Sequence, residues 1–210
     1  MAMQLVIGDK NYSSWSLRAA LTVELAGAEC EEVLVRLYQP DSRAQLLRHS
    51  PTGKVPVLVS EQGAVWDSLA IAEYLAECYP EAQLWPAEPQ ARALARSVCA
   101  EMHSGFVALR SHLPMDLARD RALAELPDDA QADIDRICAI WAGCRERFGA
   151  QGNYLFGPAS IADAFYAPVA ARLRSYRVAL PTAAAAYVET IYRWPAFQRW
   201  YQAALQEVKR

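Results

Sequence analysis

The chain has 210 residues, a net charge of −3 and 53% hydrophobic residues, with 21 basic and 24 acidic residues. This length and apolar content suffice for one large or two small globular domains. Charges of both signs are mixed along the chain without a Lys/Arg cluster, which argues against a nucleic acid or a membrane surface as partner. No apolar segment is long enough to span a bilayer, and the N-terminus does not resemble a signal peptide, so we expect a cytoplasmic protein.

The cysteines and histidines predict neither a disulfide framework nor a metal site. The five cysteines include no Cys-x-x-Cys pair, and the histidines at positions 49, 103 and 112 are isolated. An odd number of cysteines in a chain without a signal peptide is typical of reduced thiols, most of which fill cores. We therefore expect no bound metal.

The N-terminal part alternates between strand and helix patterns. An apolar run at 3–7 predicts a strand, and a helical pattern from Leu17 to Leu25 stops at Gly27. Further strands are expected at 30–37, 53–59 and 64–66, and further helices at 42–48 and after Asp67, with Ser68 as N-cap.

Three prolines between residues 79 and 89 mark a change in the pattern, because strands are no longer apparent beyond them. Helices are expected at 91–113, 128–148, 161 onward, 181–192 and 196–208. Ser160 and Asp163 have the spacing of a capping box, with Asp in place of the usual Glu. We predict a first domain at 1–79, a linker at 80–89 and an all-helical domain at 90–210.

The stretch 11–18 brings three serines to the junction of the first strand and the first helix. The first turn of a helix has backbone N–H groups without internal partners and a partial positive charge, so this junction favours an anion. The serines can also simply cap the helix. Capping needs one side chain, which Ser14 or Ser16 can supply, leaving Ser13 to face a ligand.

A second candidate feature is the proline at the entrance of the strand at 53–59. The residues alone favour an ordinary trans bond at Pro56. A cis bond between Val55 and Pro56 would instead turn the Val55 backbone outward, where a peptide-like ligand can pair with it.

With Ser13-Ser14-x-Ser16-x-Arg18, Lys54-Val55-Pro56 and Asp67-Ser68-Leu69-Ala70-Ile71 in this order, the chain resembles a cytosolic glutathione transferase over essentially its full length. The serine motif is most similar to that of the zeta class, with Trp15 in the place of that signature's cysteine. The resemblance implies an α/β thioredoxin-like N-terminal domain, an all-α C-terminal helical domain and a cis Pro56. It also implies a homodimer that binds one glutathione per subunit.

The resemblance assigns roles to individual residues. Ser13 aligns with the catalytic serine, and Ser14 is the alternative. Val55 would pair through its backbone with the cysteinyl part of glutathione, and Lys54 would lie near the glycine carboxylate. The γ-glutamyl end would be held by Asp67 and Ser68, although most relatives have Glu or Gln at the position of Asp67. The second substrate would lie against Tyr12, Trp15, Met102, Phe106, Arg110 and Tyr166, although apolar residues at such helical spacing are more often plain core than pocket lining.

Such a serine would act by donating a hydrogen bond to the glutathione thiolate. The thiolate would then attack a small electrophile or reduce a peroxide. One alternative is a glutathione-dependent maleylacetoacetate-type cis/trans isomerase; the arginine that holds the substrate carboxylate in that class falls on Ser175 here, beside Arg174. Another is a glutathione-binding or regulatory module without catalysis. A glutaredoxin-like disulfide reductase is disfavoured because Ser13 stands where a cysteine is needed.

Overall fold

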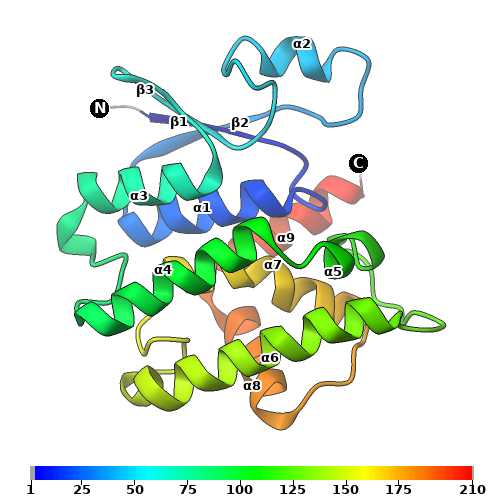
Figure 1. Cartoon of the computed structure of the whole chain (residues 1–210). Coiled ribbons are helices and arrows are strands. Elements are labelled where there is room, and N and C mark those ends of the chain that lie inside the picture. The colour runs from blue at the N-terminus through cyan, green and yellow to red at the C-terminus, as the bar shows by residue number, and fades with distance from the viewer. Residues whose placement is uncertain (1–2, 210) are drawn as a thin grey trace.

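The computed structural model describes residues 3–209 and contains a four-stranded mixed sheet followed by a helical half (Figure 1). The strand order is β2-β1-β3-β4. The central strand β1 pairs in parallel with β2 and antiparallel with β3, and β4 pairs antiparallel with β3. The strands are β1 (Met3–Ile7), β2 (Cys30–Leu34), β3 (Val57–Ser60) and β4 (Gly63–Val65).

Helices cover both faces of this sheet (Figure 1). One face carries α1 (Ser14–Ala26) and α3 (Ser68–Cys78), and the short α2 (Ser42–Leu46) lies on the other. Because side chains alternate along a strand, the sheet has apolar residues on both faces. Leu5 and Ile7 join the main core, whereas Val6 packs with residues on the α2 side, in a small cluster of Val6, Val35, Leu46 and Val57.

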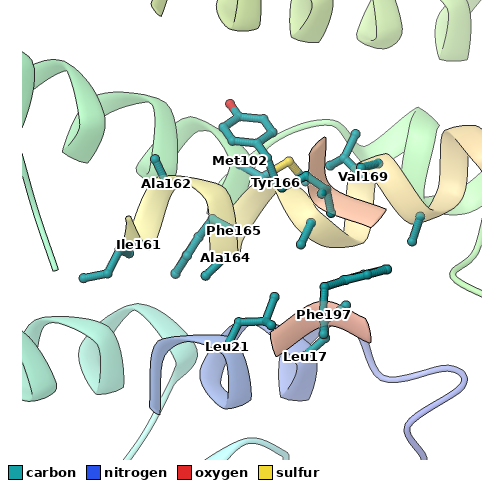
Figure 2. Close-up of a cluster of buried hydrophobic side chains, with 14 of the residues drawn as sticks. Leu17, Leu21, Met102, Ile161, Ala162, Ala164, Phe165, Tyr166, Val169 and Phe197 are labelled. Carbon is teal, nitrogen blue, oxygen red and sulfur yellow. The ribbon is translucent and has the colours of Figure 1, made fainter. Parts of the chain in front are cut away.

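The helical half is built around α7 (Ile161–Ser175), almost every residue of which is buried. Leu17 and Leu21 of α1 face α7 from one side, and Met102 of α4 lies on the other (Figure 2). The expected capping box of Ser160 and Asp163 is present at its start. The other elements are η1 (Pro80–Ala82), α4 (Pro89–Ser104), α5 (Val107–His112), α6 (Asp128–Phe148), η2 (Gly149–Gln151), α8 (Thr182–Arg193) and α9 (Pro195–Val208).

The α/β thioredoxin-like half followed by an all-α half was predicted correctly, but the helix expected at 91–113 was not. The chain breaks between α4 and α5, where Phe106 has φ of 57°. A Cβ at Gly105 would lie 2.8 Å from the carbonyl oxygen of Glu101, so this position closes α4 only as glycine. The apolar spacing continues across the break, although α4 packs mainly against α7 and α5 against α6.

Smaller differences concern the ends of elements. The second strand ends at Leu34 and the third begins only at Val57, so both are shorter than expected. The N-cap of α3 is Asp67, whose side chain accepts a hydrogen bond from Leu69 N over 3.0 Å, and the expected cap Ser68 is the first helical residue.

The peptide bond between Val55 and Pro56 is cis, as the family resemblance implies, and the bond between Trp66 and Asp67 is cis as well. Within residues 3–209, no helix has the length and apolar character needed to cross a membrane. The domain limits at 79 and 90 remain predictions.

Candidate functional site

A cavity of about 890 Å³ lies at the N-terminus of α1 and is lined by residues from both halves of the chain. It brings together residues that are far apart in the sequence, as the family resemblance implies. The predicted site residues that line it are Tyr12, Ser13, Ser14, Trp15, Lys54, Val55, Pro56, Asp67 and Arg110.

The helix-capping role falls on a different serine from the one that we expected. Ser13 is the N-cap of α1: its Oγ accepts a hydrogen bond from Ser16 N over 3.3 Å and donates one to Ser16 Oγ over 2.8 Å. The expectation that Ser14 or Ser16 caps the helix was therefore wrong. Ser14 is the first residue of α1, and its Oγ accepts a hydrogen bond from Arg172 Nη2 over 3.1 Å. Among the described residues, the Ser14 hydroxyl has no acceptor for its own proton.

The family alignment placed the carboxylate-binding position at Ser175, but the arginine of α7 that reaches the cavity is Arg172. It lies on α7, is 6% exposed, lines the cavity and donates through Nη1 to the carbonyl oxygen of Leu113 over 2.6 Å. Of the positions that the alignment favoured, Arg174 forms an ion pair with Glu189 at the surface, and Ser175 is buried. The available signal was that Arg172 directly follows the run of small and apolar residues at 164–171, so that it continues a buried helix, and an arginine is rarely buried unless its charge has a partner.

Two more arginines, Arg18 and Arg110, contact the ring of Trp15, which lines the cavity. The guanidinium of Arg18 lies 4.5 Å from the Trp15 ring centroid, and that of Arg110 lies 4.9 Å from it. Arg18 is 1% exposed, and its Nε and Nη1 have no hydrogen-bond partner among the described residues. Arg110 donates to the carbonyl oxygens of Met102 and His103.

Burial and like charge lower the pKa of Arg18 and Arg172, whereas burial lowers the pKa of Arg110 and the charge of Asp133 raises it. Burial, followed by the charges of Arg110 and Arg172, lowers the pKa of Arg18 to about 9. Burial and the charge of Arg110 lower the pKa of Arg172 to about 10, so both remain charged at neutral pH. Within residues 3–209, none of the three lies within ion-pair distance of a carboxylate. This side of the cavity is therefore suited to an anion.

The cavity is also lined by Lys54, Val55 and Asp67, the N-cap of α3, whereas the predicted site residue Ser68 is not among the lining residues. Asp67 Oδ1 caps α3, and Asp67 Oδ2 lies 3.1 Å from His103 Nε2. Ser68 Oγ is buried and has no hydrogen-bond partner among the described residues. A helix N-terminus with a free hydroxyl and a neighbouring carboxylate offers donors for a carboxylate and an acceptor for an amine.

Three predicted pocket residues do not reach the cavity. Met102, Phe106 and Tyr166 are 1%, 8% and 0% exposed and belong to the main core, where the Tyr166 hydroxyl donates to the Val98 carbonyl oxygen over 3.1 Å. Their helical spacing serves packing, because α4 and α7 bury these faces against each other and against the neighbouring helices. The cavity wall comes instead from loop residues that have no periodic pattern: Tyr38, Trp66, Pro114 and Met115. Among residues 3–209, no group of three His, Cys, Asp or Glu side chains is placed to hold a metal ion.

Comparisons with known proteins agree with this architecture. Residues 12–78 match the family model described as glutathione S-transferase, N-terminal domain. A probable maleylacetoacetate isomerase of Caenorhabditis elegans is 35% identical over 98 residues, which cover 47% of this chain and 45% of that protein. Glutathione S-transferase Z2 of Arabidopsis thaliana is 27% identical over 203 residues, which cover 90% of this chain and 88% of that protein.

A solved structure supports the same assignment. The glutathione transferase homologue from Burkholderia GL BGR1, solved with bound glutathione, has a TM-score of 0.73 and 26% identity, and the match covers 98% of each chain. The match to the Caenorhabditis elegans protein spans less than half of its length, whereas those to the plant protein and the Burkholderia structure span nearly whole chains. The family model over residues 12–78, the order of elements and the three motifs agree: the chain contains a glutathione S-transferase N-terminal domain and has the fold of glutathione transferases.

Proposed function

We propose that the chain binds glutathione in this cavity, activates its thiol with a serine hydroxyl, and conjugates it to small electrophiles or uses it to reduce peroxides. The observation that carries the proposal is the Ser14 hydroxyl, which lies at the N-terminus of α1, borders the cavity and has no acceptor for its proton among the described residues. The Ser13 hydroxyl is already donated to Ser16, which makes Ser13 the second candidate.

Thiol activation by a serine is energetically sufficient. A free thiol has a pKa of about 8.5, and lowering it to about 6.5 takes roughly 2.7 kcal/mol of preferential stabilisation of the thiolate. A hydrogen bond to a charged group contributes about 1.5 to 3 kcal/mol, and a helix N-terminus about 0.3 to 1 kcal/mol. The serine keeps its own proton, so no His/Asp partner is needed. The sulfur then forms a bond to the electrophilic carbon as the leaving group departs with its electron pair.

The rest of the cavity fits the other parts of glutathione. Val55, whose backbone forms no hydrogen bond to residues 3–209, would pair with the cysteinyl peptide group. Lys54 would attract the glycine carboxylate. The free Ser68 hydroxyl and the N-terminus of α3 would hold the γ-glutamyl carboxylate, and Asp67 its amine.

A glutathione-dependent cis/trans isomerase of maleylacetoacetate type is the second candidate. It is favoured by Arg110 and Arg172, which bring positive charge to the cavity and form no ion pair within the described chain. An acidic substrate would offset this charge. A curated relative named as a probable maleylacetoacetate isomerase supports the same reading. The thiolate would add to the conjugated double bond, allow rotation about the resulting single bond, and leave again, so that glutathione is recovered.

The deciding experiment is an ultraviolet difference titration of the thiolate of bound glutathione. We compare the wild type with Ser13→Ala and Ser14→Ala, and use Ser104→Ala, at the exposed end of α4, as the control. The proposal expects a depressed thiol pKa in the wild type and the control, with recovery in one active-site variant, Ser14→Ala by preference. Binding of glutathione with an unchanged thiol pKa in all four proteins would favour a module without catalysis.

Turnover then separates the two enzymatic candidates. Conjugation consumes glutathione with an electrophile such as a halogenated nitroarene, whereas isomerisation of a maleyl diacid proceeds with no net consumption. A homodimer in the cytoplasm completes the proposal, to be tested by light scattering and by cell fractionation.

A further inference from the structure

We propose that Arg172 is a positioning residue for the thiol chemistry: its guanidinium holds Ser14 so that the serine proton faces the cavity, and its charge makes that hydroxyl a stronger donor to the glutathione thiolate. This inference rests on the proposed function and assigns to α7 of the helical half a part in thiol activation.

The direction of the hydrogen bond carries the first step. A guanidinium has donors only, so Ser14 Oγ is the acceptor in its 3.1 Å contact with Arg172 Nη2. The serine proton therefore cannot point toward the arginine. No described residue accepts it, which leaves the cavity as the side on which an acceptor can bind.

The second step concerns the rigidity of the arginine. Arg172 Nη1 donates to the Leu113 carbonyl oxygen over 2.6 Å while Nη2 holds Ser14, so two nitrogens of one planar group are fixed. Leu113 immediately precedes the Pro114 that lines the cavity. Because both nitrogens are already held, the Arg172 guanidinium fixes the position of Ser14 Oγ before glutathione binds. Binding then costs no further conformational entropy of the Arg172 side chain.

The third step concerns charge. Arg172 is 6% exposed and has no carboxylate partner within residues 3–209, and Arg110 next to it carries the same charge. A buried, unpaired cation is costly, and a nearby anion offsets that cost. A thiolate hydrogen-bonded to Ser14 would lie one hydrogen bond beyond the guanidinium. A donor that itself accepts a hydrogen bond from a cation is polarised and binds an anion more strongly.

The test measures the thiol pKa of bound glutathione in Arg172→Gln and Arg172→Lys. Arg174→Gln is the matched control, because Arg174 lies on the same helix and pairs with Glu189 at the surface. We expect Arg172→Gln to raise the thiol pKa by about one unit, a tenfold lower ratio of thiolate to thiol. Arg172→Lys, which keeps the charge but loses the fork, should recover part of the difference, and the control none. In Arg172→Gln, turnover should fall about fivefold at pH 6.5, in proportion to the thiolate fraction, and return toward the wild-type rate above the raised pKa.

A double-mutant cycle separates action through Ser14 from action at a distance. In the Ser14→Ala background, Arg172→Gln should raise the thiol pKa no further. Additive shifts would overturn the inference, since they would mean a direct effect of charge on the sulfur. An unchanged thiol pKa in Arg172→Gln, with either a raised KM for an acidic second substrate or only a lowered melting temperature, would overturn it as well. If the wild type itself shows no depressed thiol pKa, the proposed function fails first.

Discussion

The side-chain amide of Asn11 donates a hydrogen bond to Asp116 Oδ1 over 2.8 Å, although the two residues are 105 positions apart. The Asn11 side-chain oxygen accepts from Ala118 N over 2.9 Å, and its backbone carbonyl accepts from Leu117 N over 3.3 Å. Asn11 thus ties the segment that follows α5, and with it the Met115 wall of the cavity, to the loop that precedes the serines.

Replacing this residue should loosen both sides of the site. We expect Asn11→Ala to lower the free energy of unfolding by roughly 1 to 3 kcal/mol, because it removes a fully buried side chain together with its hydrogen bonds to Asp116 and Ala118. Urea denaturation measures the change. Asn153→Ala is the control, since Asn153 is exposed and contributes only its backbone carbonyl to a hydrogen bond. Equal stability of the two variants would contradict this interpretation.

The sequence predicted those parts of the structure whose cause is local. Gly27 ends α1 in the left-handed region at φ of 63°, and the Ser160 and Asp163 box starts α7, because caps depend on residues only a few positions apart. The alternation of strands and helices up to α3 could be predicted as well, because each element has its own local pattern of apolar residues. The ends of β2 and β3 were not, since pairing with β1 decides where a strand stops.

Only those residues of the site that belong to local sequence motifs could be predicted. The contact between Ser14 and Arg172 joins residues 158 positions apart and has no local pattern. The left-handed conformation of Phe106 was equally hidden, because nothing in its own residue type favours a positive φ. Met102 and Tyr166 were assigned to the pocket from their helix faces, yet both faces are needed for packing.

The core position of Tyr166 gives a direct test of that correction. Tyr166→Phe removes the hydroxyl that donates to Val98 O and keeps the ring against Trp141, whose centroid is 5.9 Å away. We expect a loss of about 1 kcal/mol in the free energy of unfolding and an unchanged KM for the second substrate. A raised KM in steady-state kinetics with full stability would restore Tyr166 to the pocket.

Asp163 should make stability depend on pH in an unusual direction. Its buried carboxylate accepts hydrogen bonds from Leu155 N, Ser160 and the Tyr187 hydroxyl, yet burial raises its pKa from 3.8 to about 6. Between these values the folded state binds more protons than the unfolded state. The contribution of this group to the free energy of unfolding therefore falls as pH rises from about 4 to 6, by up to about 3 kcal/mol.

The measurement is a series of urea midpoints between pH 4 and 7 for the wild type and Asp163→Asn. Subtracting the variant removes the titration of other groups. The difference should decrease with pH over this window and level off above it. A difference that grows with pH would mean that the hydrogen bonds outweigh burial and hold the pKa of Asp163 below its ordinary value.

Two glycines should respond to alanine with opposite signs. A Cβ at Gly143, inside α6, meets nothing within 4 Å, so Gly143→Ala should stabilise the protein by about 0.5 to 1 kcal/mol through helix propensity. A Cβ at Gly105 meets the Glu101 carbonyl oxygen at 2.8 Å, so Gly105→Ala should destabilise it and displace the start of α5. Thermal unfolding of both variants checks the pair, and a shift of the same sign in both would refute the packing argument.

The burial of α7 on all sides has a consequence for how the molecule opens. This helix packs against α1 of the thioredoxin-like half as well as against α4 and α8. If α7 unfolds, the apolar residues that pack against it in both halves become exposed to solvent. Separate melting of the two halves would expose its whole apolar surface. We expect a single cooperative transition, and amide hydrogens of α7 that exchange with solvent only through global unfolding. Partial unfolding will then begin at the sheet edge and the loops, leaving the frame behind the serines intact until the whole fold is lost.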